Sequence, residues 1–201
     1  MDSISQSILN FIENISLTWQ LIVLSFFSFA EGLPIIGSIL PGGTIAIFAG
    51  SLSANGTMNA FLAFLLVGIS SFLGDMVGFL LGKKFLHFKW IKNIVHNEKF
   101  KKSWDLFDRH VAIITIFGKL IPVIRSTPSL LAAVRGVKSR KYILYSFTGS
   151  LLWGAVGIYA GNFFTKYFGE KVISFIFILI IISILIVLIQ QTIKQARNKI
   201  K

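Results

Sequence analysis

Three apolar runs in this chain are long enough to cross a lipid bilayer as helices, and they restrict its fold more than any other feature. Residues 172–190 contain no charged side chain, and their length corresponds to about 28 Å of helix. Residues 142–164 form a second run, and residues 59–81 form a third that only Asp75 interrupts. Because the chain is 54% hydrophobic, above the roughly 45–50% of soluble domains, we expect an all-α polytopic membrane protein with three transmembrane spans.

Two further apolar stretches, residues 18–52 and 111–137, are each interrupted by two prolines. A proline inside a helix removes a backbone hydrogen bond and disrupts the preceding turn. Backbone groups freed in this way are tolerated at membrane depth only where protein or water satisfies them. We therefore expect both stretches to form re-entrant helical hairpins, which are shaped by Pro34, Pro41, Pro122 and Pro128.

The basic residues indicate how the chain is oriented in the membrane. All 20 Lys and Arg residues lie between positions 83 and 201, and they cluster beside apolar runs, as the positive-inside rule describes. If residues 83–110 are cytoplasmic, a re-entrant second hairpin brings every basic cluster and the C-terminus to that side. Residues 83–110 also carry recurring aromatic and aliphatic side chains, which is typical of an interfacial amphipathic helix. Topology thus explains the basic charge, and no nucleic-acid partner is expected.

The chain also contains an internal similarity. The segment "PIIGS" at 34–38 matches "PVIRS" at 122–126, and "GDMVGFLLGKKF" at 74–85 matches the spaced glycines of "WGAVGIYAGNFF" at 153–164. Because the two hairpins open toward opposite sides, the similarity predicts an inverted repeat within one membrane domain. Its predicted parts are a first repeat at 1–82, a second repeat at 83–165, an additional span at 172–190 and a basic tail at 191–201.

Apart from Arg135, which belongs to the basic cluster at the end of the second stretch, four charged side chains lie within the apolar segments: Glu31, Asp75, Lys119 and Arg125. Each charge at a helix centre costs about 2.5–3.5 kcal/mol on insertion scales, so we expect the two acids to pair with the two bases. Broken helices of inverted repeats form transporter binding sites near the bilayer midplane. A purely structural interpretation also exists, in which the four charges only lock the hairpins together.

Several classes of active site are not expected in this chain. There is no cysteine, which excludes disulfides, thiolate metal sites and cysteine nucleophiles. His87, His96 and His110 have spacings that indicate no metal-ligand set, and no phosphate-binding glycine loop or nucleophile elbow occurs. An intramembrane aspartyl protease would have to use Glu31 and Asp75 as its carboxylate pair. We therefore expect no enzyme activity, no catalytic residues, no metal and no cofactor.

The motifs resemble those of the DedA family of bacterial membrane proteins, whose relatives share the VTT, or SNARE-associated-type, domain. The resemblance rests on "EGLPIIGSILPGGTIAIFAG", "GDMVGFLLGKKF", "FGKLIPVIRSTPSLLAA" and "GSLLWGAVGIYAG", and it covers residues 20–165. It implies a bacterial inner-membrane protein that moves lipids, including undecaprenyl phosphate and phosphatidylethanolamine, across the bilayer, often with proton motive force. Three positions depart from the family pattern: Gly43 replaces a frequent second acid, Lys119 replaces arginine and Ala133 replaces glycine.

Two functions therefore remain open at this stage. In a lipid translocase, or flippase, Arg125 and Lys119 bind the lipid phosphate, while Glu31 and Asp75 act as their charge partners or carry protons. In the alternative, the same charges serve a proton-coupled carrier of a small solute or ion. The identity of the lipid, the direction of movement, the proton dependence and the oligomeric state are left open by the sequence. The missing acid at Gly43 bears on proton coupling more than on lipid binding.

The topology can be tested with single cysteines, because the native chain contains none. We expect Asn55→Cys to react with a membrane-impermeant thiol reagent from outside sealed cells, whereas Lys99→Cys and Lys201→Cys react only after the membrane is opened. Labelling of positions 55 and 99 from the same side would contradict the inverted topology.

Overall fold

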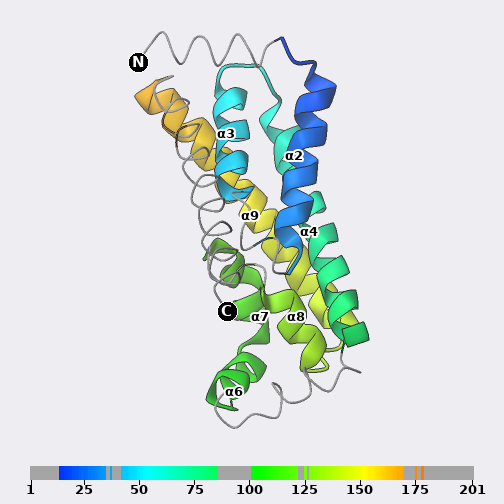
Figure 1. Ribbon diagram of the computed structural model, residues 1–201. Helices are drawn as coiled ribbons and strands as arrows, with labels where there is room; N and C mark the ends of the chain where they lie inside the picture. The colour runs from blue at the N-terminus through cyan, green and yellow to red at the C-terminus, as the bar shows by residue number, and fades with distance from the viewer. Residues whose placement is uncertain are drawn as a thin grey trace, which may run out of the picture.

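The computed structural model describes residues 14–34, 37, 42–85, 101–121, 125, 127–169, 175 and 178 (Figure 1). Every regular element within these residues is helical. In chain order the elements are α2 (Leu17–Gly32), α3 (Gly42–Ala54), α4 (Ala60–Phe85), α6 (Lys101–Arg109), α7 (Val111–Phe117), the 3-10 helix η3 (Gly118–Leu120), α8 (Thr127–Val134) and α9 (Ser139–Phe168).

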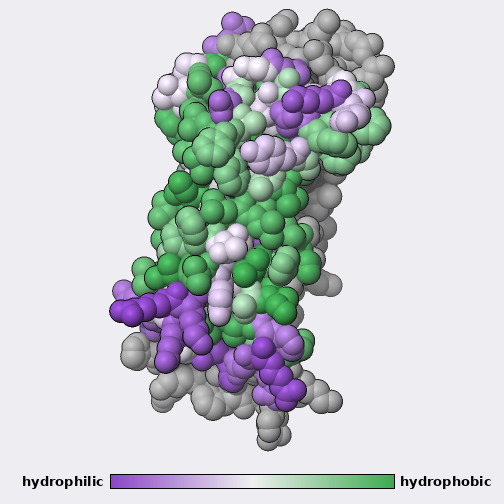
Figure 2. All heavy atoms as spheres, turned by 180° about the vertical axis from the view of Figure 1, so that it is seen from behind, coloured by the Kyte–Doolittle hydropathy of each residue, from purple (hydrophilic) through white to green (hydrophobic). Residues whose placement is uncertain are grey.

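Among the described residues, two helices are long and apolar enough to cross a membrane, and they run along most of the described molecule (Figure 1). They are Ala60–Lys84 in α4 and Ser139–Phe168 in α9, which agrees with two of the three predicted spans. The face shown in Figure 2 carries a hydrophobic zone between hydrophilic groups at either end, as a surface in contact with lipid requires. Apart from Phe175 and Ile178, which are helical and exposed, the predicted span 172–190 lies outside the described residues.

The shorter helices surround this pair in an alternating arrangement. Helices α2 and α3 lie in the upper half of Figure 1, and α7 and α8 lie in the lower half. Helix α2 packs on α4, the next long helix in the chain, and α7 likewise packs on α9. Helices α3 and α8 instead pack on the long helix from the other half of the chain, α9 and α4 respectively. Each broken segment therefore contacts both long helices.

Glycines allow these helices to approach closely, as small residues do in membrane proteins. Those shared by the two matched segments are Gly78, Gly82, Gly157 and Gly161. A Cβ atom on Gly82 would lie 2.6 Å from the Cβ of Ala133 in α8, and one on its match, Gly161, would overlap the carbonyl oxygen of Ile47 in α3. A Cβ atom on Gly157 would lie 2.8 Å from the Cβ of Ala46, which also belongs to α3. Gly82 and Gly161 thus each face a short helix from the other half of the chain, although the division of the chain at residue 82 stays a prediction.

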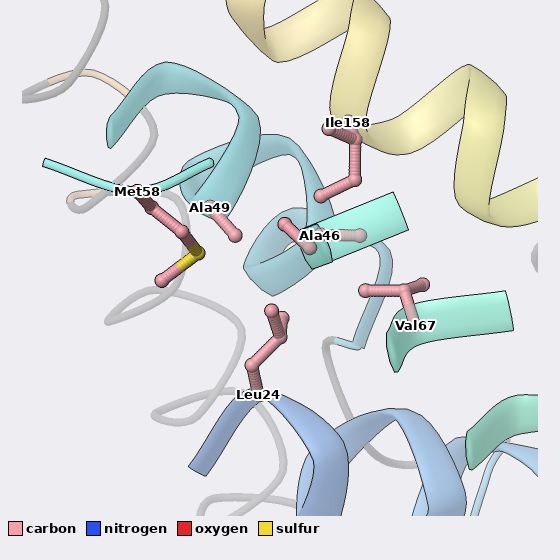
Figure 3. Close-up of a cluster of buried hydrophobic side chains, with 7 residues drawn as sticks. Leu24, Ala46, Ala49, Met58, Val67 and Ile158 are labelled. Carbon is pink, nitrogen blue, oxygen red and sulfur yellow. The ribbon is translucent and has the colours of Figure 1, made fainter. Parts of the chain in front are cut away.

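Two apolar clusters hold the helices together at different levels. The upper cluster joins α2, α3, α4 and α9 (Figure 3), and its buried members are Leu24, Ala46, Ala49, Met58, Ala63, Val67 and Ile158. The lower cluster consists of Phe79, Phe107, Ala132, Ala133 and Tyr142. Along α4, Val67 of the upper cluster and Phe79 of the lower cluster are separated by three helical turns. Ser71 and Asp75 occupy the same helix face between them, so these two polar side chains lie between the two apolar clusters.

The predicted hairpins and interfacial helix are described in part. Each proline-containing segment consists of two helical arms with a break between them, α2 and α3 in the first and α7–η3 and α8 in the second. Pro41 and Pro122 lie outside the described residues, as do residues 86–100 of the expected amphipathic segment. Within that segment α6 has a buried Phe107 beside exposed polar neighbours. Whether the broken segments are re-entrant stays a prediction.

The close contact between α3 and α9 can be tested with two neighbouring substitutions. Gly157→Leu has no room beside Ala46, and overpacking of this kind costs about 1–3 kcal/mol. Val156 is 44% exposed, so Val156→Leu should leave stability nearly unchanged. We expect thermal unfolding in detergent to show a lower Tm for Gly157→Leu than for the wild type, and a nearly unchanged Tm for Val156→Leu. Equal Tm values for both variants would contradict this packing.

Candidate functional site

Two buried ion pairs lie at the centre of the described molecule, and they join the four intramembrane charges. The Nζ of Lys119 lies 2.5 Å from Oδ2 of Asp75, and these side chains are 6% and 3% exposed. Arg125 pairs with Glu31, where the side chains are 10% and 4% exposed. The prediction that the two acids pair with the two bases is confirmed, with one base for each acid. The two bases come from the second broken segment, Glu31 comes from the first, and Asp75 comes from α4.

Glu31 is positioned by the end of α2. The helix ends at Gly32, and Leu33 is extended, with φ −74° and ψ 135°, because the residue before a proline disfavours the helical region. Gly32 then contacts the backbone of α4, since a Cβ atom there would lie only 2.8 Å from the Asp75 nitrogen. This contact brings the two carboxylate-bearing segments side by side. The ring of the following proline, Pro34, faces Gly78 of α4.

Lys119 is positioned by η3, which tightens the chain after α7. Gly149 allows α7 to approach α9, because a Cβ atom at this position would lie 3.0 Å from the Cα atom of Ile116. The Nζ of Lys119 donates a hydrogen bond to Ser71 at 3.1 Å and another to Ser150 at 2.5 Å. With Asp75, the ammonium has three oxygen partners, which matches its three N–H donors.

Serines on both long helices complete this part of the site. Ser146 of α9 donates a hydrogen bond to Oδ2 of Asp75 at 2.5 Å. Ser71 lies one turn before Asp75 on α4, and Ser146 and Ser150 are one turn apart on α9, so each pair shares a helix face. All three serines are buried, and none was predicted as a site residue. The sequence signal that would have identified them is the four-residue spacing, which places Ser71 on the face of Asp75 and places Ser146 and Ser150 on one face of a neighbouring span.

Arg125 connects both broken segments. Besides pairing with Glu31, its Nη2 donates a hydrogen bond to the carbonyl oxygen of Gly37 at 3.0 Å. Its guanidinium carbon lies 5.9 Å from the centre of the Trp153 ring, within the range of a cation–π interaction. Trp153 was recognised in the sequence only as part of a span. Pro128 is buried in the first turn of α8, where a missing backbone N–H is tolerated.

The glycine at position 43 has a structural consequence at Arg125. A Cβ atom on Gly43 would lie 3.3 Å from Nη1 of Arg125 and 2.9 Å from the Trp153 ring. An acidic side chain at this position would therefore reach the guanidinium. In this chain the indole of Trp153 takes that space, and Glu31 is the acid that pairs with Arg125.

The space among these residues is small. The cavity has a volume of about 10 Å³, which is about enough for one water molecule. Its lining residues are Glu31, Gly32, Ser71, Asp75, Lys119, Arg125 and Trp153. The site is therefore closed, and its charges neutralise one another. A phosphate group can enter only if the surrounding helices move apart.

The fold and site together define a helical membrane protein with a buried ionic centre. The chain belongs to the VTT domain family, because the model of this domain matches residues 40–163. It is a DedA-family membrane protein, and it shares 25% identity with Protein DedA of Escherichia coli K12 over 151 residues, which are 73% of this chain and 69% of that protein. The four paired charges all belong to segments on which the sequence resemblance rests.

Two further relatives match over a similar number of residues of this chain. Inner membrane protein YghB of Escherichia coli K12 is 25% identical over 159 residues, which are 75% of this chain and 73% of that protein. Inner membrane protein YabI of the same organism is 27% identical over 146 residues, which are 69% of this chain and 55% of that protein. No solved structure matches the chain.

The Arg125–Glu31 pair can be tested through stability. Removing one partner of a buried pair leaves an uncompensated charge and typically costs about 3–5 kcal/mol. We expect Arg125→Gln to lower the free energy of unfolding by this order. The double variant Glu31→Gln/Arg125→Gln should recover much of the loss, because two neutral amides replace the pair. Denaturant unfolding in detergent micelles measures the free energy of unfolding of the single and double variants. A loss in the double variant equal to the sum of the losses in Glu31→Gln and Arg125→Gln would contradict the pairing.

Proposed function

We propose that this protein is a lipid translocase of the bacterial inner membrane. It moves a phosphate-bearing lipid, such as undecaprenyl phosphate or phosphatidylethanolamine, across the bilayer without changing it chemically. The observation that carries this proposal is the convergence of two acids and two bases from separate segments at one buried point. Membership of the DedA family supports it, and relatives named as inner membrane proteins support the location.

The bases have the chemistry that a phosphate site needs. The planar guanidinium of Arg125 presents a fork of donors that matches two phosphate oxygens, and the ammonium of Lys119 adds a compact positive charge. In the closed structure each base directs one donor at a carboxylate oxygen, and both bases donate further hydrogen bonds to serine or backbone oxygens. We infer that Glu31 and Asp75 occupy the place of the lipid phosphate while the site is empty. The lipid then exchanges with the carboxylates.

This exchange links lipid binding to protons. When the phosphate displaces a carboxylate, that carboxylate is left buried and unpaired, and a buried unpaired acid becomes neutral by taking up a proton. Lipid binding is therefore expected to take up a proton and to strengthen as the pH falls. Release of the lipid reverses the exchange, because the carboxylate ionises again when it recovers its base.

The helix arrangement supports a way of opening the site. Arg125 contacts the first broken segment through Glu31 and the carbonyl oxygen of Gly37, so separating the two segments exposes the guanidinium. The alternating contacts of α3 with α9 and of α8 with α4 fit an inverted repeat. In such a repeat, movement of one half against the other opens a central site to either side in turn.

Transport by purified variants in vesicles tests the proposal. We expect Glu31→Gln/Arg125→Gln to abolish transfer of undecaprenyl phosphate and phosphatidylethanolamine, since it removes the guanidinium without leaving a buried unpaired acid. Arg125→Lys should retain a small fraction of activity, because it keeps the charge and loses the fork. Thermal unfolding shows whether each variant is folded.

A matched control comes from Arg135, whose ion pair with Asp108 is partly exposed. Arg135→Gln should transport both lipids at nearly the wild-type rate. Normal transport by folded Glu31→Gln/Arg125→Gln would leave the ionic centre with only a structural role. Movement of a small soluble solute with no lipid transfer would instead favour a solute carrier.

A further inference from the structure

A second cavity lies away from the ionic centre, where α6, α7 and the start of α9 meet. Its volume is about 370 Å³, within the range of about 300–1,000 Å³ that is usual for small-ligand sites. Three basic side chains line it: Arg109 of α6, Lys138 before α9, and Lys141 in the first turn of α9. Tyr145, one turn further along α9, adds a hydroxyl group. In the predicted topology this cavity faces the cytoplasm.

The carboxylate in the cavity wall belongs to Asp108, and it already has a partner. Nε of Arg135 donates to both oxygens of Asp108 at 3.1 Å, and Nη2 of Arg135 donates to Oδ2. These hydrogen bonds raise the pKa of Arg135 above its ordinary value, so its guanidinium stays charged. Among the described residues, no carboxylate pairs with any of the three basic side chains that line the cavity. The cavity therefore has an excess of positive charge.

The floor of the cavity is apolar and packed. Val111 and Val137 line it, and both also pack against the lower cluster that contains Phe107 and Tyr142. The basic side chains therefore share the cavity with a packed apolar wall. The positive-inside rule accounts for basic residues on this side of the membrane. It does not require them to converge on a cavity from separate helices, nor the wall carboxylate to be held by another arginine.

We propose that this cavity binds the phosphate group of an anionic ligand, which is either a lipid head group of the cytoplasmic leaflet or a soluble phosphate. Arg109, Lys138 and Lys141 neutralise the charge of the phosphate, and the hydroxyl of Tyr145 donates a hydrogen bond to it. Charge-assisted hydrogen bonds to phosphate are short and strong, which suits these donors. The site is separate from the ionic centre, so it does not depend on the proposed transport function.

Calorimetric titration of the full-length protein in a neutral detergent tests this site. The probes are dioctanoyl phosphatidic acid, inorganic phosphate and, as an uncharged comparison, dioctanoylglycerol. All titrations use the Glu31→Gln/Arg125→Gln background, so that the guanidinium of the ionic centre cannot bind the probes. We expect saturable binding of at least one phosphate probe and none of dioctanoylglycerol. Binding of the lipid alone identifies a head-group site, and equal binding of inorganic phosphate identifies a soluble ligand.

A matched pair of variants distinguishes the cavity from general surface charge. Lys138→Gln/Lys141→Gln removes two cavity cations, and we expect at least about tenfold weaker binding, since two charge-assisted hydrogen bonds to the phosphate are lost. Lys84→Gln/Arg140→Gln removes two exposed cations that do not line the cavity, and binding should change less than about twofold. Equal weakening in both variants, or no saturable phosphate binding, would overturn the proposal. Thermal unfolding shows whether the variants are folded.

Discussion

The burial of four charges among apolar helices is the constraint on which the rest of this structure depends. Charged side chains at this depth must be paired, and the helices are arranged so that each acid meets a base. Gly32 brings the end of α2 against α4, and Gly149 brings α7 against α9, which places both acids and both bases within reach of one another. The serines then satisfy the remaining donors of Lys119. The centre is therefore neutral overall, well packed and closed.

The closed state of this ionic centre fits the proposed carrier function. Among the described residues, the space that its side chains enclose is only about 10 Å³ while the carboxylates hold Arg125 and Lys119. A ligand that replaces the carboxylates has to be anionic, and it has to supply several oxygens at once, as a phosphate does. The same exchange leaves an acid to be protonated. Closure of the empty state, selection of the ligand and coupling to protons would then follow from one set of ion pairs.

Much of this arrangement could be predicted from the sequence, because charges and prolines in apolar segments have few physical explanations. The helical class, two spans, the broken segments and the pairing of acids with bases were predicted in this way. The partner of each acid was not predicted, because sequence position does not determine which base pairs with Asp75 and which pairs with Glu31. Ser146 and Ser150 were missed because a serine within a helix can also satisfy itself on its own backbone. The second cavity depends on Arg109 and Lys138 meeting from separate elements, which residue spacing does not reveal.

In the proposed transport cycle, a lipid phosphate takes the place of the carboxylates that hold Arg125 and Lys119. Infrared difference spectroscopy of the reconstituted protein, recorded with and without undecaprenyl phosphate, tests this exchange most directly because it detects carboxyl protonation. We expect lipid binding to produce a band of a protonated carboxyl group, and we expect Glu31→Gln and Asp75→Asn together to remove this band. Lipid binding that leaves every carboxylate band unchanged would contradict the exchange of phosphate for carboxylate.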